Sequence, residues 1–216
     1  MTNLRITEIF LSLQGESTRA GLPCVFVRLT GCALRCVWCD SAYAFTGGTE
    51  RTVEDVVQEV AALGAPLVEI TGGEPLEQEG FHPLSESLLT LGKTVLVETG
   101  GHVSLARVDP RVIKIVDVKC PGSGMEAAND PGNLATLNPH DEVKFVVADR
   151  KDFDYAIALV DRLDLTSRAT VLISPVFEGD RSPLAAEVAE WIRDSGRSLR
   201  LNLQLHKFLW GDVAGR

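Results

Sequence analysis

Short apolar runs alternate along most of the chain with segments in which apolar residues recur every three to four positions. Runs of the first kind predict buried strands, and segments of the second kind predict amphipathic helices. We therefore predict strands over Val25–Thr30, Leu67–Thr71, Thr94–Glu98, Val112–Val118, Asp141–Val147, Thr170–Ser174 and Leu199–Leu203.

Several of the predicted helices have recognisable ends. Thr52 has the character of an N-cap, the apolar residues after it keep a 3.6-residue period, and Gly64 ends the segment. Ser182 and Pro183 have N-cap and N1 character at the start of another helix. Further helices are predicted around Leu84–Leu91 and over Asp152–Leu163.

Strands separated by helical segments predict βαβ units and a parallel sheet. About six such units are too few for a closed eight-fold barrel. We therefore expect an α/β fold, an open, partial TIM-like barrel of about six βα units, with its site at the carboxyl ends of the strands. Residues 121–138 are rich in Gly, Pro, Asn and Ala and predict an irregular insertion. Without a repeat or linker, residues 1–216 are predicted to form a single domain.

Composition narrows the class of protein. The 216 residues are 45% hydrophobic and 24% charged, which is typical of soluble globular proteins. The start of the chain lacks the apolar region of a signal peptide, and no apolar run is long enough to span a membrane. A net charge of −9 argues against binding to nucleic acid. These features predict a cytoplasmic protein that binds neither membranes nor nucleic acid.

Three cysteines with CxxxCxxC spacing, Cys32, Cys36 and Cys39, are the strongest chemical signal. Three thiolates from one loop can bind three irons of a 4Fe-4S cluster and leave the fourth iron open for catalysis. No fourth cysteine lies close in sequence, and Trp38 would cover one side of the cluster. Cys24 is interpreted instead as a small buried hydrophobic residue, as is Cys120.

A zinc site is the main alternative at these cysteines. It would need a fourth ligand such as Cys120 or a histidine, and none has the paired spacing of a zinc ribbon or finger. We rank the cluster ahead of zinc, and zinc ahead of a chance arrangement. The four histidines are His82, His102, His140 and His206.

Polar or glycine-containing motifs follow several predicted strands. Glycines at such a position let the backbone approach a ligand, and the carboxylate of Glu74 could accept from a ligand ammonium group. Each motif alone is more often structural than functional, but together they predict one cofactor site at this edge of the sheet. The motifs are Gly72-Gly-Glu-Pro75, Glu98-Thr-Gly-Gly101, Asp117-Val-Lys119 and Ser174-Pro-Val176.

The cysteine loop, with the aromatic Trp38 before its last cysteine, resembles the signature of the radical S-adenosylmethionine (SAM) enzymes. Further motifs between about residue 6 and residue 211 are similar to those of the 7-carboxy-7-deazaguanine synthase family. They are Leu13-Gln-Gly-Glu16, Cys39-Asp-Ser41, Thr71-Gly-Gly-Glu-Pro75, Glu98-Thr-Gly100 and Leu205-His-Lys-Phe-Leu-Trp210.

This resemblance implies a carbon–nitrogen lyase that contracts a pterin ring in the biosynthesis of 7-deazapurines such as queuosine. The implied substrate is 6-carboxy-5,6,7,8-tetrahydropterin, and the products are 7-carboxy-7-deazaguanine and ammonia. The implied cofactors are a 4Fe-4S cluster, SAM and Mg²⁺. Beyond the cluster and SAM, the resemblance names no catalytic residue. It also implies an external electron donor and a homodimer.

The resemblance also implies roles for individual residues. Ser41 would bind Mg²⁺. The implied SAM contacts are Trp38, Cys39, Asp40, Gly73, Glu74, Asp117, Val118, Lys119, Ser174, Pro175, Val176 and Phe177. The implied substrate contacts are Leu13, Gln14, Gly15, Glu16, Arg28, Thr71 and His206.

The chemistry of these residues fits the implied roles. Gln14 and Glu16 could read the donors and acceptors on the edge of a pterin. Arg28 lies near the end of a predicted buried strand and can make a bidentate pair with the pterin carboxylate. The alternative interpretation is that Arg28 only extends its side chain to the protein surface and binds no ligand. Ser41 would supply one neutral oxygen to a magnesium ion that keeps water and substrate ligands.

Two other functions remain open from the residues. An activase that makes a glycyl radical on a partner protein shares the cysteine loop and the partial barrel, but it would need an exposed groove for a polypeptide. A zinc-binding or electron-transfer module without enzymatic activity is the alternative of a different class.

Overall fold

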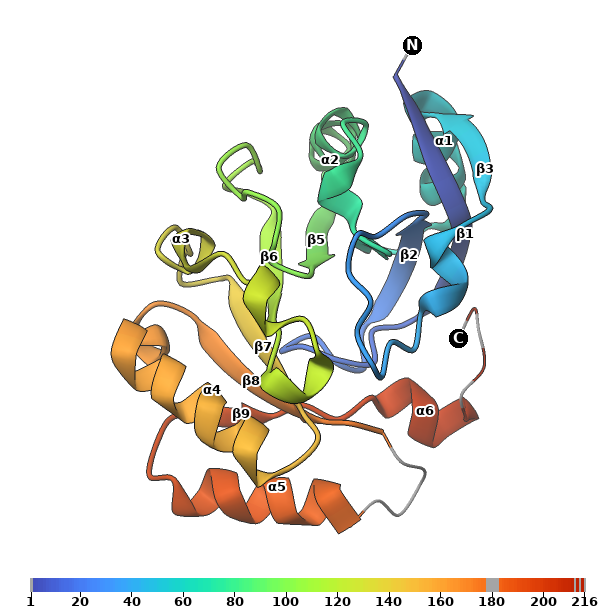
Figure 1. Cartoon of the computed structure of the whole chain (residues 1–216). Coiled ribbons are helices and arrows are strands. Elements are labelled where there is room, and N and C mark those ends of the chain that lie inside the picture. Colours follow the sequence, from blue (N-terminus) through green and yellow to red (C-terminus); the bar gives the residue numbers. More distant parts are fainter. Residues whose placement is uncertain (1, 178–182, 212, 214, 216) are drawn as a thin grey trace.

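The computed structural model describes residues 2–177, 183–211, 213 and 215. Their strands form one sheet of order β3-β1-β2-β4-β5-β6-β7-β8-β9, in which all neighbours from β2 to β9 are parallel and β1 is antiparallel to β2 and β3. The sheet curves but does not close into a barrel (Figure 1). The strands are β1 (Asn3–Leu13), β2 (Pro23–Leu29), β3 (Thr49–Thr52), β4 (Leu67–Gly72), β5 (Thr94–Thr99), β6 (Ile113–Val118), β7 (Glu142–Val147), β8 (Thr170–Pro175) and β9 (Leu199–Leu201).

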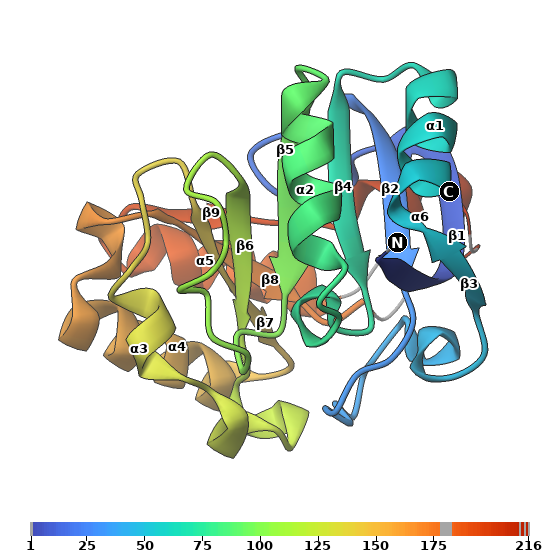
Figure 2. The ribbon, with the colours of Figure 1, turned by 90° about the horizontal axis from the view of Figure 1, so that it is seen from above.

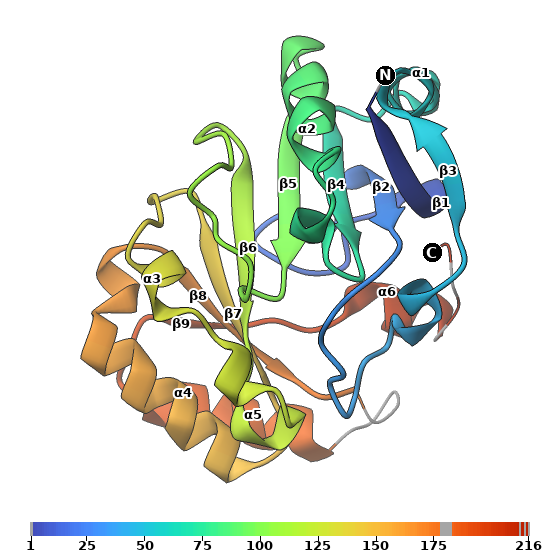
Figure 3. The ribbon, with the colours of Figure 1, turned by 45° about the horizontal axis from the view of Figure 1, so that its top comes forward.

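Five helices, α1 to α5, cover the outer face of the curved sheet, and α6 lies across the opening between its two edges (Figures 1, 2 and 3). Within the described residues, no helix combines the length and the apolar character needed to cross a bilayer. The helices are α1 (Val53–Leu63), α2 (Phe81–Thr90), α3 (Pro131–Leu134), α4 (Arg150–Leu163), α5 (Pro183–Asp194) and α6 (Leu205–Trp210).

The predicted partial barrel is confirmed, and all seven predicted strands are present with small changes at their ends. The end signals of α1 are also confirmed: Thr52 Oγ1 accepts a hydrogen bond from Asp55 N at 3.1 Å, and Gly64 has a φ of 79°. The Ser182 cap lies outside the described residues. The predicted irregular insertion is confirmed as two short 3-10 turns and the four-residue α3.

The strands β1 and β3 and the helix α6 were not predicted from the sequence, and β5 and β6 are joined by a loop without a helix. In β1 only Leu4 and Ile6 are fully buried, so the strand lacks the continuous apolar run that marks the central strands. The strand β3 has only four residues, and none of them is buried. Both belong to the antiparallel edge of the sheet, where alternation rather than a buried run is the expected pattern.

The two faces of the sheet have different roles. On β2, the side chains of Val25 and Val27 pack into the core between sheet and helices. On the opposite face, Phe26 belongs to a second apolar cluster inside the curve of the sheet, and its ring stacks on Phe10 at 5.1 Å. The next inward residue toward the carboxyl end is Arg28. The inside of the barrel therefore has an apolar base below a polar layer.

A long connection between β1 and β2, residues 14–22, reaches the far strands of the open barrel; we call it the β1–β2 loop. Ser17 N donates to Asn202 Oδ1 at 2.8 Å, and Leu205 N donates to Gly15 O at 2.8 Å. Glu142 on β7 accepts hydrogen bonds from Thr18 N at 3.2 Å. The loop thereby joins the beginning of the chain to its last strand and to α6.

Candidate active site

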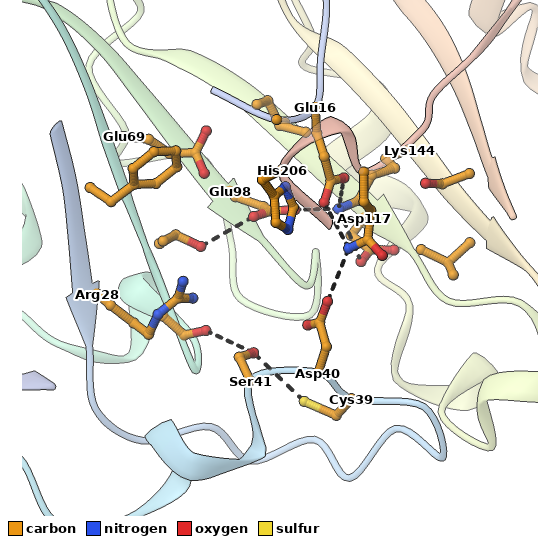
Figure 4. Close-up of a pocket in the computed structure, with 18 of the residues that line it drawn as sticks. Glu16, Arg28, Cys39, Asp40, Ser41, Glu69, Glu98, Asp117, Lys144 and His206 are labelled. Atoms are coloured by element: carbon orange, nitrogen blue, oxygen red, sulfur yellow. Dashed lines mark hydrogen bonds and ion pairs between the residues drawn. The ribbon is translucent and has the colours of Figure 1, made fainter. Parts of the chain in front are cut away.

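A cavity of about 690 Å³ lies at the carboxyl ends of the parallel strands. The cysteine loop after β2, the glycines after β4 and the β1–β2 loop all contribute to its wall. Every predicted site residue lines it except Glu74 and Val118. Motifs that are distant in the sequence therefore face one space, part of which is shown in Figure 4.

Glu74 and Val118 lie behind the cavity wall. The buried carboxylate of Glu74 accepts hydrogen bonds from Gly100 N at 2.7 Å, Thr99 Oγ1 at 2.9 Å and Leu76 N at 3.0 Å. It thus holds the loop after β5 in position against the turn after β4. Val118 belongs to the core beneath the helices because successive residues of a strand face opposite sides.

The backbone of the cysteine loop is fixed by the glycine motif after β4. Glu74 N donates to Gly31 O at 2.7 Å, and a Cβ atom on Gly73 would lie 1.9 Å from that same oxygen. A side chain at Gly73 would therefore push the two loops apart. This close approach explains why glycine is needed one βα unit after the cysteines.

The three loop cysteines have the chemistry that a cluster requires. Cys32, Cys36 and Cys39 are free thiols, partly exposed to one cavity. Burial raises the pKa of Cys32 to about 11, so this thiol stays protonated at neutral pH unless a metal displaces the proton. Three thiols around a common space fit a cluster in which each thiolate binds a different iron.

A zinc site would need a fourth ligand beside the three loop cysteines. Among the described residues, no three Cys, His, Asp or Glu side chains gather as ligands of a single metal ion. Cys120 is buried outside the cavity wall, and of the four histidines His206 is the one that lines it.

Arg28 and Ser41 line the same cavity (Figure 4). Arg28 Nε donates to Glu8 Oε1 at 2.7 Å, and the Tyr43 hydroxyl donates to that oxygen at 2.8 Å. Among the described residues, the side-chain hydrogen bond of Arg28 is made by Nε, so the two Nη atoms at the end of the guanidinium could bind a ligand. The Ser41 hydroxyl lies 3.5 Å from Gly72 O and 3.7 Å from Cys39 Sγ.

The β1–β2 loop contributes two polar side chains whose orientation is fixed. Gln14 Oε1 accepts from Glu16 N at 2.9 Å, and Gln14 Nε2 donates to the buried Glu69. Beside them the ring of His206 packs so closely on Gly15 that a Cβ atom there would lie 2.0 Å from its Nδ1. Both the loop and α6 therefore shape this wall of the cavity.

Two of the predicted SAM residues, Asp117 and Asp40, lie in the same cavity wall. Asp117 Oδ2 pairs with Lys119 Nζ at 3.0 Å, while its buried Oδ1 has no hydrogen-bond partner among the described residues. Asp40 pairs with Lys207 Nζ at 2.9 Å; burial opposes ionisation, but Lys207 and Gln204 lower the pKa of Asp40 to about 2. The free oxygen of Asp117 fits a donor group on a bound cofactor.

Some charged residues of the cavity wall were not predicted from the sequence. Lys144 and Glu69 occupy inward-facing positions on central strands, beside Glu98 of the predicted Glu98-Thr-Gly-Gly101 motif. Burial raises the pKa of Glu69 well above its usual value, whereas Lys144 overcomes burial to lower the pKa of Glu98. The available signal was a charged residue inside an otherwise apolar strand, which is rarely buried without a partner. Gln204, at the start of α6, and Lys207, within α6, do not lie in an apolar strand, so this pattern could not identify them.

Comparisons with known proteins agree with this geometry. The model of the Radical SAM superfamily matches residues 26–130. The 7-carboxy-7-deazaguanine synthase of Koribacter versatilis is 46% identical over 96% of this chain and 97% of its own length. The synthase of Chlorobaculum tepidum is 42% identical over 98% of this chain and 96% of its own length.

A solved structure extends the match to three dimensions. The crystal structure of QueE from Escherichia coli superposes with a TM-score of 0.76, covers 94% of this chain and 95% of that chain, and is 25% identical. The chain is more than 40% identical to two synthases over nearly its full length, and it has the cysteine loop and the partial barrel described above. This chain therefore belongs to the 7-carboxy-7-deazaguanine synthase family of radical SAM enzymes.

Proposed function

We propose that the protein converts 6-carboxy-5,6,7,8-tetrahydropterin to 7-carboxy-7-deazaguanine and ammonia in the biosynthesis of 7-deazapurines such as queuosine. The observation that carries this proposal is the single cavity that holds the three loop cysteines, Arg28 and Glu16. We further propose that residues 1–216 act as one radical SAM domain in the cytoplasm, as a homodimer that receives electrons from an external donor.

Cys32, Cys36 and Cys39 would hold the 4Fe-4S cluster, and the unpartnered oxygen of Asp117 supports a SAM site beside it. When bound, the cluster and SAM would supply the radical chemistry of the reaction. Gly73 would contact SAM through its backbone, and a side chain there would also collide with Gly31 of the cysteine loop. The other SAM contacts would come from residues 38–40, from Lys119 and from the end of β8.

Arg28 would bind the carboxylate of the pterin. Glu8 and Tyr43 hold the guanidinium while its two Nη atoms stay available for a bidentate pair. At the other end of the substrate, Gln14 and Glu16 would read the edge of the pterin, with Leu13, Gly15, Thr71 and His206 as further contacts.

Ser41 would bind Mg²⁺ near the substrate carboxylate. A single neutral hydroxyl suits a hard cation that takes its remaining ligands from water and substrate. Its position in the same cavity as Arg28 supports this role, because both groups could reach one carboxylate.

The proposed function is tested by anoxic incubation with SAM, dithionite and the carboxy-tetrahydropterin. We expect a product with the mass of 7-carboxy-7-deazaguanine, together with ammonia. The same protein sample should contain iron and sulfide, and its visible absorption should give it a brown colour. Absence of the product from an iron-loaded enzyme that cleaves SAM would contradict the proposed substrate.

We expect Ser41→Ala to lower turnover through loss of substrate positioning. Added magnesium should stimulate the parent enzyme more than the variant, because the variant lacks one oxygen ligand. Turnover measured over a range of magnesium concentrations checks this. Equal stimulation of both proteins would remove Ser41 from the magnesium site.

Membership in the synthase family makes the two other functions considered from the sequence unnecessary as explanations. The relatives are synthases, so neither a zinc-binding module nor an electron-transfer module is needed to explain the cysteines. No observation favours the glycyl-radical activase over the synthase.

A further inference from the structure

Lys144 is a buried charged residue of the cavity that has no role in the proposed function. It lies on the central strand β7, with a side chain only 7% exposed, and it lines the cavity together with Val146. Its register partner on β6 is Asp117. Burying an unpaired ammonium group would strongly destabilise the folded protein. The groups that pair with Lys144 therefore indicate what it does in the site.

Three carboxylates from three different segments surround this ammonium group (Figure 4). Lys144 Nζ lies 3.2 Å from Glu16 Oε2 of the β1–β2 loop, pairs with Glu98 of β5 and lies 4.0 Å from Asp117 Oδ2. Burial alone would lower the pKa of Lys144, but these carboxylates raise it well above its usual value. Lys144 is therefore a cation at neutral pH.

The contacts of Glu16 show how much its orientation depends on Lys144. Glu16 Oε2 accepts from Lys144 and from Asn202 Nδ2 at 3.0 Å, while Oε1 accepts from Gln204 Nε2 at 3.0 Å. A carboxylate has about four acceptor positions, so about one remains for a ligand N–H. Lys144 is the one charged donor of the three, and hydrogen bonds to charged groups are the stronger ones.

We propose that Lys144 is a positioning residue for substrate selectivity: it orients the carboxylate of Glu16 so that the remaining acceptor position faces the N–H edge of the pterin. This inference rests on the proposed function. Lys144 thereby links substrate recognition by the β1–β2 loop to the strands that carry the SAM residues.

The test compares Lys144→Met with Lys114→Met. Lys114 is a matched control, because it is equally buried on the neighbouring strand β6, pairs with Asp141 at 2.9 Å and lies outside the cavity wall. We expect Lys144→Met to raise the KM for the pterin about tenfold or more, the size of effect of one hydrogen bond to a charged group. Iron content should stay at the parental level, because the three loop cysteines are unchanged. Lys114→Met should lower thermal stability but leave the KM unchanged.

A second readout is selectivity. The parent enzyme should strongly prefer the pterin to an analogue without its 2-amino group, because a site built to accept from an N–H rejects ligands that lack it. Lys144→Met should reduce this preference, and Lys144→Arg should restore part of it. If Lys144→Met does not fold, the double variant Glu98→Gln/Lys144→Met removes one cation and one anion together and should show the same rise in KM.

The outcomes separate the inference from the proposed function. A parent enzyme that cleaves SAM but makes no deazaguanine would overturn the proposed function and this inference with it. A productive parent whose folded Lys144 variants keep the parental KM and selectivity would overturn the inference alone. An equal rise in KM with Lys114→Met would also overturn it, because the effect would then be a general one of buried lysines.

Discussion

Replacement of Cys32, Cys36 or Cys39 by Ala is expected to abolish the assembled cluster and all SAM cleavage. Each of these thiols faces the cavity, and each would bind a different iron, so the remaining two cannot replace the third. Iron and sulfide content, the visible absorption spectrum and 5′-deoxyadenosine formation under anoxic conditions measure the loss.

Cys24→Ala and Cys120→Ala are the matched controls. Both thiols are free and fully buried, and both lie outside the cavity wall. We expect these variants to keep the cluster and to cleave SAM. Loss of the cluster in Cys120→Ala as complete as in Cys36→Ala would mean that a fourth cysteine is a ligand, and the reading of an open iron would be wrong.

Arg28→Ala is expected to separate radical formation from product formation. The substitution removes a charged, bidentate partner inside a site that is largely shielded from water, which typically costs about 2–5 kcal/mol. Since about 1.4 kcal/mol corresponds to a factor of ten, product formation should fall by between one and several powers of ten. The cysteines and the glycines after β4 are unchanged, so the variant should keep its iron and form 5′-deoxyadenosine slowly.

Measuring 5′-deoxyadenosine and deazaguanine in one anoxic assay tests this expectation. Arg28→Lys should recover only part of the loss, because a point charge cannot reproduce the planar guanidinium. Arg107→Ala is a control, since that arginine is exposed and paired with Glu79 away from the cavity. Normal product formation by Arg28→Ala would make Arg28 a structural residue and weaken the case for a pterin carboxylate.

The sequence predicts those parts of the site whose chemistry lies in short segments. Cys32, Cys36 and Cys39 occupy one loop, and Gly72 and Gly73 follow one strand, so spacing and chain order reveal them. Arg28 was also predictable, because a charged residue in a buried strand needs a partner. The central strands were found because most of their residues are apolar.

The remaining residues depend on contacts that no local pattern contains. Lys144 and Glu16 are 128 positions apart, and the role of each is visible only when both meet in the cavity. Glu74 gives a second example, because the hydrogen bonds of its carboxylate with Thr99 and Gly100 of the next unit are not apparent from its motif. Helix α6 escaped prediction because it is short and makes its key contacts with the β1–β2 loop.

The β1–β2 loop has a consequence for the order in which the site is assembled during synthesis. Its bond from Ser17 to Asn202 joins residues 185 positions apart, and a chain emerging from the ribosome presents its N-terminal part first. Gly73 and Glu74, which contact the cysteine loop, are synthesised long before residues 202–205, which contact Gly15 and Glu16. The substrate-reading half of the site, and the pair of Asp40 with Lys207, can therefore form only when the last strand and helix have emerged.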